Sequence, residues 1–285
     1  MPYSALWEPW LCNTLLAMAG IPQPKTNEIV AQLQLVINTG EFPDDLTWHR
    51  IKRDSRALRD RADPVSGNVC LAMIAGLEWN KPELDAAARR AVQLENHDAH
   101  VHLNIALAYS QMAALSEAAE HAYSAYEVFQ SVDFSGAKPT DITDIVSSLY
   151  FAGHVAKANE VKEALETYTQ RDLEVGVFAV NSMMEELGVT EERLRHEIDA
   201  ATELLRERQY RMRRASFYPL RHEDGARTIE YELEVRCPSN EIIPLTLAYV
   251  DRIGDSDDWD PSVFNLSFTA RNTHEEADAD SEEFA

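Results

Sequence analysis

Hydrophobic residues recur every three or four positions through the first three quarters of the chain. This spacing places them on one face of a helix and predicts a series of amphipathic helices. Thr26-Asn27-Glu28 is expected to cap a helix whose apolar face covers residues 29–37, and a more polar helix follows over residues 47–61. The Arg and Asp residues of that second helix are spaced to form ion pairs on an exposed face. The segment 63–67, which contains Pro64, ends it before a repeated pattern begins.

Two helical blocks in the middle of the chain align at a fixed offset. A shift of 34 residues aligns Leu71 with Ile105, Ala72 with Ala106, Ala88 with Ala122 and Ala91 with Ala125. A period of about this size marks repeats built from two antiparallel helices. Small residues at these positions allow the helices to approach closely. A third block over residues 141–169 follows after about six inserted residues, which brings the stack to the three units that stability requires.

In these blocks the chain resembles the tetratricopeptide-repeat family, over roughly 100 of its 285 residues. In that family the first helices of successive units line a groove that grips a partner segment. The resemblance implies the following groove positions here: Val69, Met73, His100, Leu103, Asn104, Leu107 and Gln111. Asn104 matches an asparagine that some members use to bind a peptide carboxylate, but their lysines and arginines have no counterpart. A carboxylate clamp is therefore not expected.

The hydrophobic period changes to two near the C-terminus. Helical spacing continues over residues 173–212, and then apolar residues alternate with glutamates from Ile229 to Cys237, which predicts a strand with one wet face. Asp224-Gly225 predicts a hairpin turn after a strand at 215–221. Further alternation predicts strands at 243–249 and 264–268 in an antiparallel β-meander, covered by the preceding helices.

The sequence thus predicts an α+β fold that is mainly α, with a stack of helical hairpins followed by a small antiparallel sheet packed on helices. The expected divisions are an N-terminal helical cap at 1–66, helical repeats at 67–172, helices plus sheet at 173–272, and an acidic disordered tail at 273–285.

The net charge of −23 is concentrated in two segments. Residues 63–170 contain 6 Lys and Arg against 15 Asp and Glu, and residues 222–285 contain 4 against 17. Such a surface repels nucleic-acid phosphates, so direct nucleic-acid binding is not expected. The acidic surface either serves solubility alone or favours a partner with a basic surface. No segment approaches the roughly 20 apolar residues of a membrane helix. Three widely spaced cysteines and the lack of a signal-peptide pattern indicate a cytoplasmic protein.

The sequence contains no phosphate-binding loop or hydrolase motif, so no catalytic residues and no cofactor are expected. His97, His100 and His102 do not share one helix face, and no metal site is expected there. Trp259, in the acidic loop 254–261, is either a contact point for a partner or a cover for the sheet. The arginines of 206–214 either contact nucleic acid or, more economically, pair with glutamates of the strand at 229–237.

Together these features indicate a non-enzymatic adaptor or assembly subunit that binds a basic, partly apolar segment of a protein partner. Two alternatives remain. One is an acidic inhibitor or DNA mimic of the counter-defence type, which would block a nucleic-acid-binding protein. The other is an enzyme with a cryptic site between the helices and the sheet.

Overall fold

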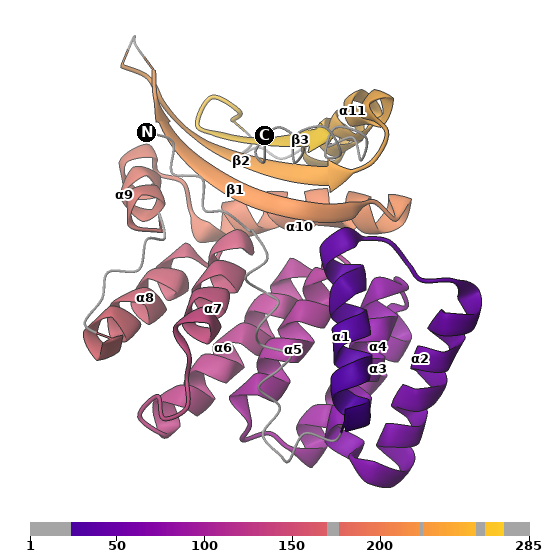
Figure 1. Cartoon of the computed structure of the whole chain (residues 1–285). Helices are drawn as coiled ribbons and strands as arrows, with labels where there is room; N and C mark the ends of the chain where they lie inside the picture. Colours follow the sequence, from indigo (N-terminus) through magenta and orange to yellow (C-terminus); the bar gives the residue numbers. More distant parts are fainter. Residues whose placement is uncertain (1–23, 170–176, 223–224, 255–259, 271–285) are drawn as a thin grey trace, which may run out of the picture. The chain divides into compact units, whose positions relative to one another are not determined.

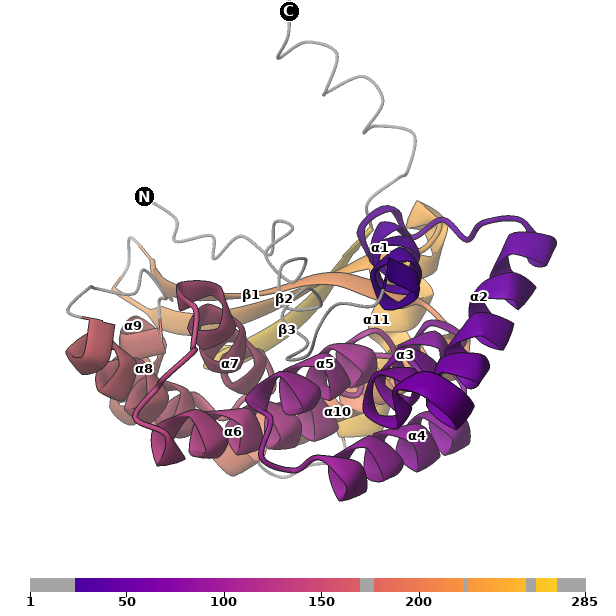
Figure 2. The same ribbon diagram turned by 60° about the horizontal axis from the view of Figure 1, so that its bottom comes forward.

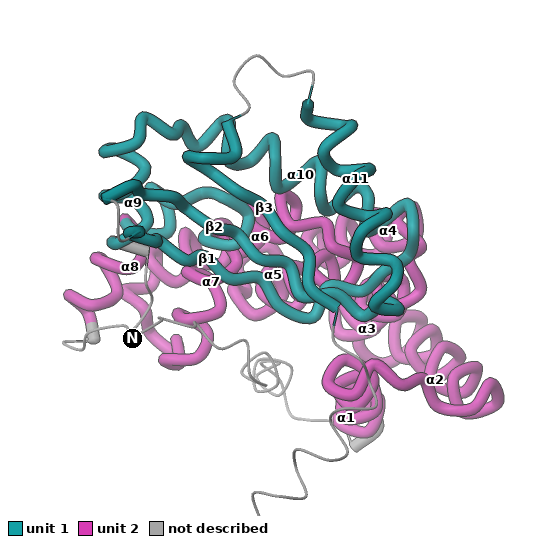
Figure 3. The backbone as a smooth tube through the Cα atoms, turned by 90° about the horizontal axis from the view of Figure 1, so that it is seen from above, with its two compact units in different colours: residues 1–7, 150–159, 174–285 teal, residues 8–149, 160–173 magenta. Residues whose placement is uncertain are grey.

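The computed structural model describes residues 24–169, 177–222, 225–254 and 260–270. The chain forms two compact units (Figure 3). The helical unit comprises residues 8–149 and 160–173, and the sheet unit comprises residues 1–7, 150–159 and 174–285. The boundary falls inside the third helical pair, so that its two helices contribute residues to both units.

The helical unit is built from antiparallel helix pairs (Figure 1, Figure 2). Its first six helices are α1 (Pro24–Thr39), α2 (Asp45–Ala57), α3 (Pro64–Leu77), α4 (Lys81–Leu94), α5 (Ala99–Ser110) and α6 (Leu115–Ser131). Helix α3 packs on α4, α5 packs on α6, and α3 also packs on α5. Helices α7 (Pro139–Phe151) and α8 (Val155–Thr169) follow, joined by a turn at Gly153 with a φ of +82°. The predicted helices of all three pairs are therefore present.

The N-terminal end of α1 differs from the expectation. Thr26 was expected to cap this helix, but α1 already includes Pro24, and Thr26 is buried inside it. Proline suits the first turn of a helix because its fixed φ is helical and its missing N–H has no partner to lose there. The expected apolar face is confirmed, since Ile29, Leu33 and Val36 are buried.

The sheet unit contains three helices and three strands among the described residues. They are α9 (Val177–Leu187), α10 (Glu191–Arg208), β1 (Arg211–Arg221), β2 (Arg227–Arg236), α11 (Ile242–Ile253) and β3 (Phe264–Ala270). Strands β1 and β2 form the expected antiparallel hairpin, with Gly225 at a φ of +89° in the turn. Strand β1 begins four residues before the predicted position, because Gln209, at a φ of +56°, ends α10 and reverses the chain.

The predicted strand at 243–249 is wrong, because this segment belongs to helix α11. Leu245, Tyr249 and Ile253 are buried at a spacing of four, whereas Ile243 and Leu247 are 70% and 60% exposed. The helix carries the chain back along the sheet, so β3 pairs with β2 in parallel rather than antiparallel. A parallel connection needs such a crossover. The sheet is therefore mixed, in the order β1-β2-β3, and not an antiparallel meander.

One face of this sheet is apolar and is covered by helices. Phe217 of β1 lies opposite Tyr231 of β2, and Tyr231 lies opposite Leu266 of β3; all three side chains are buried. Helix α9 packs on β1 and β2, α10 packs on β1 and β3, and α11 packs on β3. The hydroxyl of Tyr231, which is fully buried, donates a hydrogen bond to the backbone oxygen of Phe151 at 2.7 Å. The inference that helices cover the sheet is confirmed.

The opposite face carries the charged residues of the hairpin. Arg214 lies opposite Glu234 in the register, and the Arg213 Nε atom is 3.8 Å from Glu234 Oε1. Arg208 pairs with Glu241 at 3.5 Å, on the short turn that precedes α11. The predicted pairing with glutamates of the strand at 229–237 is thus confirmed for Arg213, whereas Arg208 pairs with an acid outside that strand.

A buried polar triad links the helices of the sheet unit. Glu197 of α10 is only 3% exposed, and its carboxylate accepts hydrogen bonds from the Tyr249 hydroxyl at 2.8 Å and from Arg193 Nε at 3.0 Å. Arg193 also donates to the backbone oxygen of Asp260 at 3.0 Å. Burial, followed by the nearby Glu197 carboxylate, raises the pKa of Tyr249 well above its usual value. The hydroxyl is therefore a permanent donor to the buried carboxylate.

Replacing Tyr249 by phenylalanine is expected to lower the free energy of unfolding by about 2 kcal/mol, because a buried carboxylate loses one of its two donors. Thermal and urea unfolding followed by near-ultraviolet circular dichroism would measure this loss. Tyr218→Phe is the matched control, since the Tyr218 hydroxyl has no partner among the described residues. A loss of equal size in both variants would contradict the role of the Glu197 contact.

Among the described residues, none of the helices combines the length and apolar character that a bilayer crossing requires.

Candidate functional site

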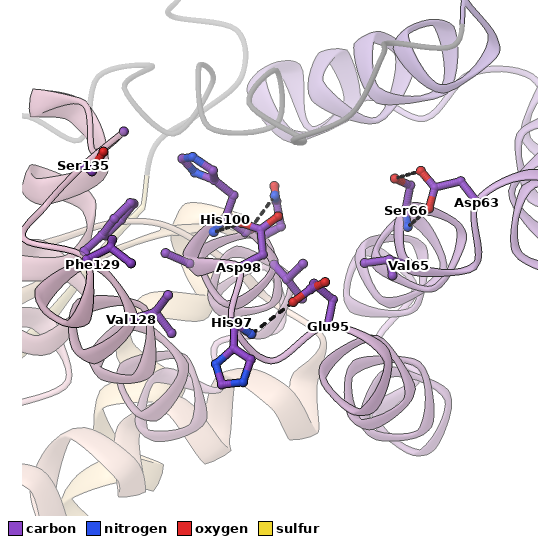
Figure 4. Close-up of a pocket in the computed structure, with 15 residues that line it drawn as sticks. Asp63, Val65, Ser66, Glu95, His97, Asp98, His100, Val128, Phe129 and Ser135 are labelled. Carbon is purple, nitrogen blue, oxygen red and sulfur yellow. Dashed lines mark hydrogen bonds between the residues drawn. The ribbon is translucent and has the colours of Figure 1, made fainter.

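A pocket of about 550 Å³ opens at one end of the helical unit (Figure 4). It lies among the N-terminal end of α3, the N-terminal end of α5 with the turn before it, and the C-terminal end of α6 with the turn after it. A cavity of this size is within the range of small-molecule and side-chain binding sites. The lining residues are Asp63, Val65, Ser66, Glu95, His97, Asp98, Ala99, His100, Val101, Asn104, Val128, Phe129, Val132, Ser135 and Gly136.

Helix capping places two of its carboxylates. Asp63 caps α3, and its side chain accepts hydrogen bonds from the backbone N–H and the hydroxyl of Ser66. Asp98 caps α5 by accepting from the backbone N–H of His100 at 2.9 Å. Aspartate is favoured at such positions because its carboxylate satisfies N–H groups that have no partner within the helix. Helices α3 and α5 pack on one another, and both capping aspartates line the pocket (Figure 4).

The electrostatic character of the pocket is acidic. Glu95 adds a third carboxylate, which accepts from the backbone N–H of His97 at 3.3 Å. Among the described residues that line the pocket there is no lysine or arginine. The carboxylates are therefore not neutralised by a cation within the lining, and the pocket attracts positive charge.

The other wall of the pocket is apolar. Val128, Phe129 and Val132 come from the end of α6 and the turn that follows it, and Val65 faces them from α3 (Figure 4). The His100 ring stands edge-on to Phe129, with 5.6 Å between ring centroids and an interplanar angle of 79°. A long side chain with an apolar stem and a charged end matches such a mixed lining.

Two buried polar atoms of the lining residues, Asn104 Oδ1 and His100 Nδ1, have no hydrogen-bond partner among the described residues, and neither has Asp141 Oδ1, which lies outside the lining. Asn104 is 1% exposed, and its Nδ2 atom donates to the backbone oxygen of His100 at 2.7 Å. Asp141, which is fully buried, accepts from the backbone N–H of Lys138 at 2.9 Å and lies 3.9 Å from His100 Nδ1. Unsatisfied buried polar groups are rare in native proteins and call for an explanation.

Of the positions expected to contact a partner, the structure brings His100 and Asn104 together in this pocket. Met73, Leu103 and Leu107 are 0%, 5% and 5% exposed. Val69 is also buried, and Gln111 is half-buried directly after α5. Trp259 lies outside the described residues. The assignment of these positions to a partner stays a prediction.

The sequence did not identify Asp63, Glu95 or Phe129 as binding residues. A usable signal was present, because Asp63 and Asp98 each precede the first helix of a repeat and lie 35 residues apart, close to the repeat length. Equivalent caps of neighbouring repeats occupy the same end of a stack, which is where both aspartates line the pocket. Nothing comparable in the sequence marks Glu95.

A second polar cluster connects α4, α5 and α6. The Tyr109 hydroxyl donates to Asp85 Oδ1 at 2.8 Å, and the His121 ring stacks on Tyr109 with centroids 5.5 Å apart. The Nδ1 atoms of His102 and His121 are 3.4 Å apart. Burial is the main cause that lowers the pKa of both histidines, and it lowers that of His121 to about 4. Both rings are therefore neutral near pH 7, and one Nδ1 donates to the other.

Within the described residues, no three or more His, Cys, Asp or Glu side chains are grouped so as to hold a metal ion. The candidate site is thus a pocket of carboxylates, buried acceptors and apolar side chains.

Comparisons with protein-family models, with curated proteins and with solved structures found no match to this chain.

Proposed function

We propose that the chain is a non-enzymatic interaction adaptor that holds a basic, partly apolar segment of a partner protein in the pocket at the end of the helical unit. The observation that carries the proposal is the lining itself, in which three carboxylates and a row of apolar side chains occur without a lysine or arginine among the described residues. The helical pairs are then repeats of the tetratricopeptide kind, but with an acidic site in place of a carboxylate clamp. Electrostatic complementarity of this type selects partners and speeds their association.

The test is selection of random peptides on the intact chain, followed by affinity measurement of the selected sequences. We expect enrichment of lysine or arginine next to an apolar residue. Glu95→Lys should weaken the selected peptides about tenfold, because it places a like charge beside the bound cation. Glu120→Lys is the control, since Glu120 is exposed on α6 outside the pocket and the change in net charge is the same. Failure to select any peptide, or equal effects of the two variants, would contradict the proposal.

The overall acidity supports a second candidate, an inhibitor that occupies the binding surface of a nucleic-acid-binding protein. The net charge of −23 is the observation in its favour. Such a complex should be displaced by DNA and weaken steeply with salt. Both complexes involve opposite charges, so the variants separate the two candidates. The adaptor complex should be weakened by Glu95→Lys and not by Glu120→Lys, whereas a mimic that uses its overall acidity should be weakened similarly by both.

A further inference from the structure

We propose that Asn104 Oδ1 is the innermost acceptor for the cationic end of a partner side chain, the ammonium group of a lysine or the guanidinium group of an arginine. The inference rests on the proposed function and deepens it, because it assigns one residue and one chemical group to the interior of the pocket. The acidity of the pocket lining alone identifies neither the residue nor the chemical group.

The orphaned acceptor is the first observation. Asn104 lines the pocket, is 1% exposed, and leaves its Oδ1 atom without a partner while its Nδ2 atom donates to the backbone of the preceding turn. The free energy lost by burying an acceptor without a hydrogen bond is regained only when a donor arrives. Since the missing partner must donate, a ligand that offers only acceptors does not complete the site.

The charge around that acceptor is the second observation. Asp63, Glu95 and Asp98 line the same pocket, and the buried carboxylate of Asp141 lies behind His100 with one oxygen unpartnered. These carboxylates favour a hydrogen-bond donor that carries a positive charge. Lysine and arginine are the side chains that donate and are cationic throughout the physiological pH range.

The apolar wall of the pocket explains why the partner side chain should have a long apolar stem. Val128, Phe129 and Val132 give the pocket apolar lining in addition to its polar groups. The methylene stems of lysine and arginine cover such surface while their charged ends reach polar partners. A water molecule could satisfy Asn104 alone, but it would give no preference for a basic side chain.

Asn68 provides a matched comparison within the same unit. It is 4% exposed in α3, and its Nδ2 atom donates to the backbone oxygen of Pro64 at 2.6 Å, the same contact with the residue four positions earlier that Asn104 makes in α5. Asn68 does not line the pocket, and its Oδ1 is not one of the unpartnered buried atoms. The two asparagines therefore share their local structural role, and of the two only Asn104 lines the pocket.

The experiment uses the ¹⁵N-labelled intact chain and three small probes: the Nα-acetyl methylamides of lysine, arginine and norleucine. The side-chain amide resonance of Asn104, assigned by its loss in Asn104→Leu, should shift saturably with the lysine or arginine probe and stay unchanged with norleucine, which has an apolar chain of similar length. The probe that binds more tightly shows whether the partner side chain is a lysine or an arginine. Equal shifts with norleucine would show that the response follows the apolar stem and needs no cationic donor, which would overturn the proposal.

The variants separate binding from folding. Asn104→Leu should weaken selected basic peptides by about tenfold or more, the usual effect of removing an acceptor from a charged donor. It should leave the unfolding midpoint unchanged or raised, because it removes an unsatisfied buried group. Asn68→Leu should leave peptide affinity unchanged. If peptides are selected but bind Asn104→Leu as tightly as the original chain, this inference fails and the proposed function stands; if no peptide is selected, the proposed function itself fails.

Discussion

Replacing Gly76 by alanine is expected to lower the free energy of unfolding of the helical unit by about 3 kcal/mol. A Cβ atom at this position would lie 2.2 Å from the backbone oxygen of Ala108 and 3.1 Å from its carbonyl carbon. These atoms belong to the backbone of α5, so no side-chain rotation can relieve the overlap, and α3 and α5 must separate. Alanine is the better helix former by about 1 kcal/mol, but the loss of close packing outweighs that gain.

Urea unfolding followed by far-ultraviolet circular dichroism measures the effect. Gly136→Ala is the control, because a Cβ atom there meets nothing within 4 Å and only the φ of +85° opposes the substitution. We expect this control to lose about 1 kcal/mol. A Gly76→Ala variant as stable as the control would show that the two helices do not depend on this close approach.

The second large effect is a loss of stability in acid that depends on His121. Burial and the nearby His102 lower the pKa of His121 from 6.5 to about 4 in the folded chain. Because the unfolded chain takes up the proton first, the contribution of this group to stability is fully present above pH 6.5. It is lost progressively as the pH falls from 6.5 to about 4, to the extent of roughly 3 kcal/mol. Stability should therefore rise with pH across this range.

Free energies of unfolding measured at pH 7 and at pH 4 provide the test. In His121→Gln the difference between the two values should be smaller than in the original chain by an amount on the order of 3 kcal/mol. Carboxylates that titrate in the same range affect both chains equally and cancel in the comparison. His49→Gln, which changes an exposed histidine of α2, should retain the full acid sensitivity. Equal pH profiles for all three chains would contradict the role of His121.

The helical unit could be predicted in detail because its helices depend on local periodicity and on caps. Asp63 before Pro64 and Asp98 before Ala99 cap the helices α3 and α5 through local hydrogen bonds. The small residues Ala72 and Ala106 are both buried, in helices that pack on one another. In each case the determining interactions lie within a few residues or one repeat of each other.

The sheet unit could be predicted only in part. The hairpin followed from the strict alternation of β2 and from the turn glycine, Gly225. Residues 242–253 have apolar positions at spacings of both two and four, so strand and helix fit the local pattern equally well. Burial of Tyr249 against Phe268, with ring centroids 5.9 Å apart, and its contact with Glu197 favour the helix. Those partners lie far away in sequence.

By itself the sequence determined the helical pairs, the hairpin and the acidic character. These features depend on residue type and on short-range spacing, both of which can be read along the chain. Only the tertiary structure decided that α11 is a helix and that β3 runs parallel to β2. It also decided that Asp63, Glu95 and Asp98 line one pocket with Asn104, whose Oδ1 atom has no partner among the described residues. Such features depend on contacts between segments far apart in sequence, where the free energy of burial and of hydrogen bonding outweighs local preference.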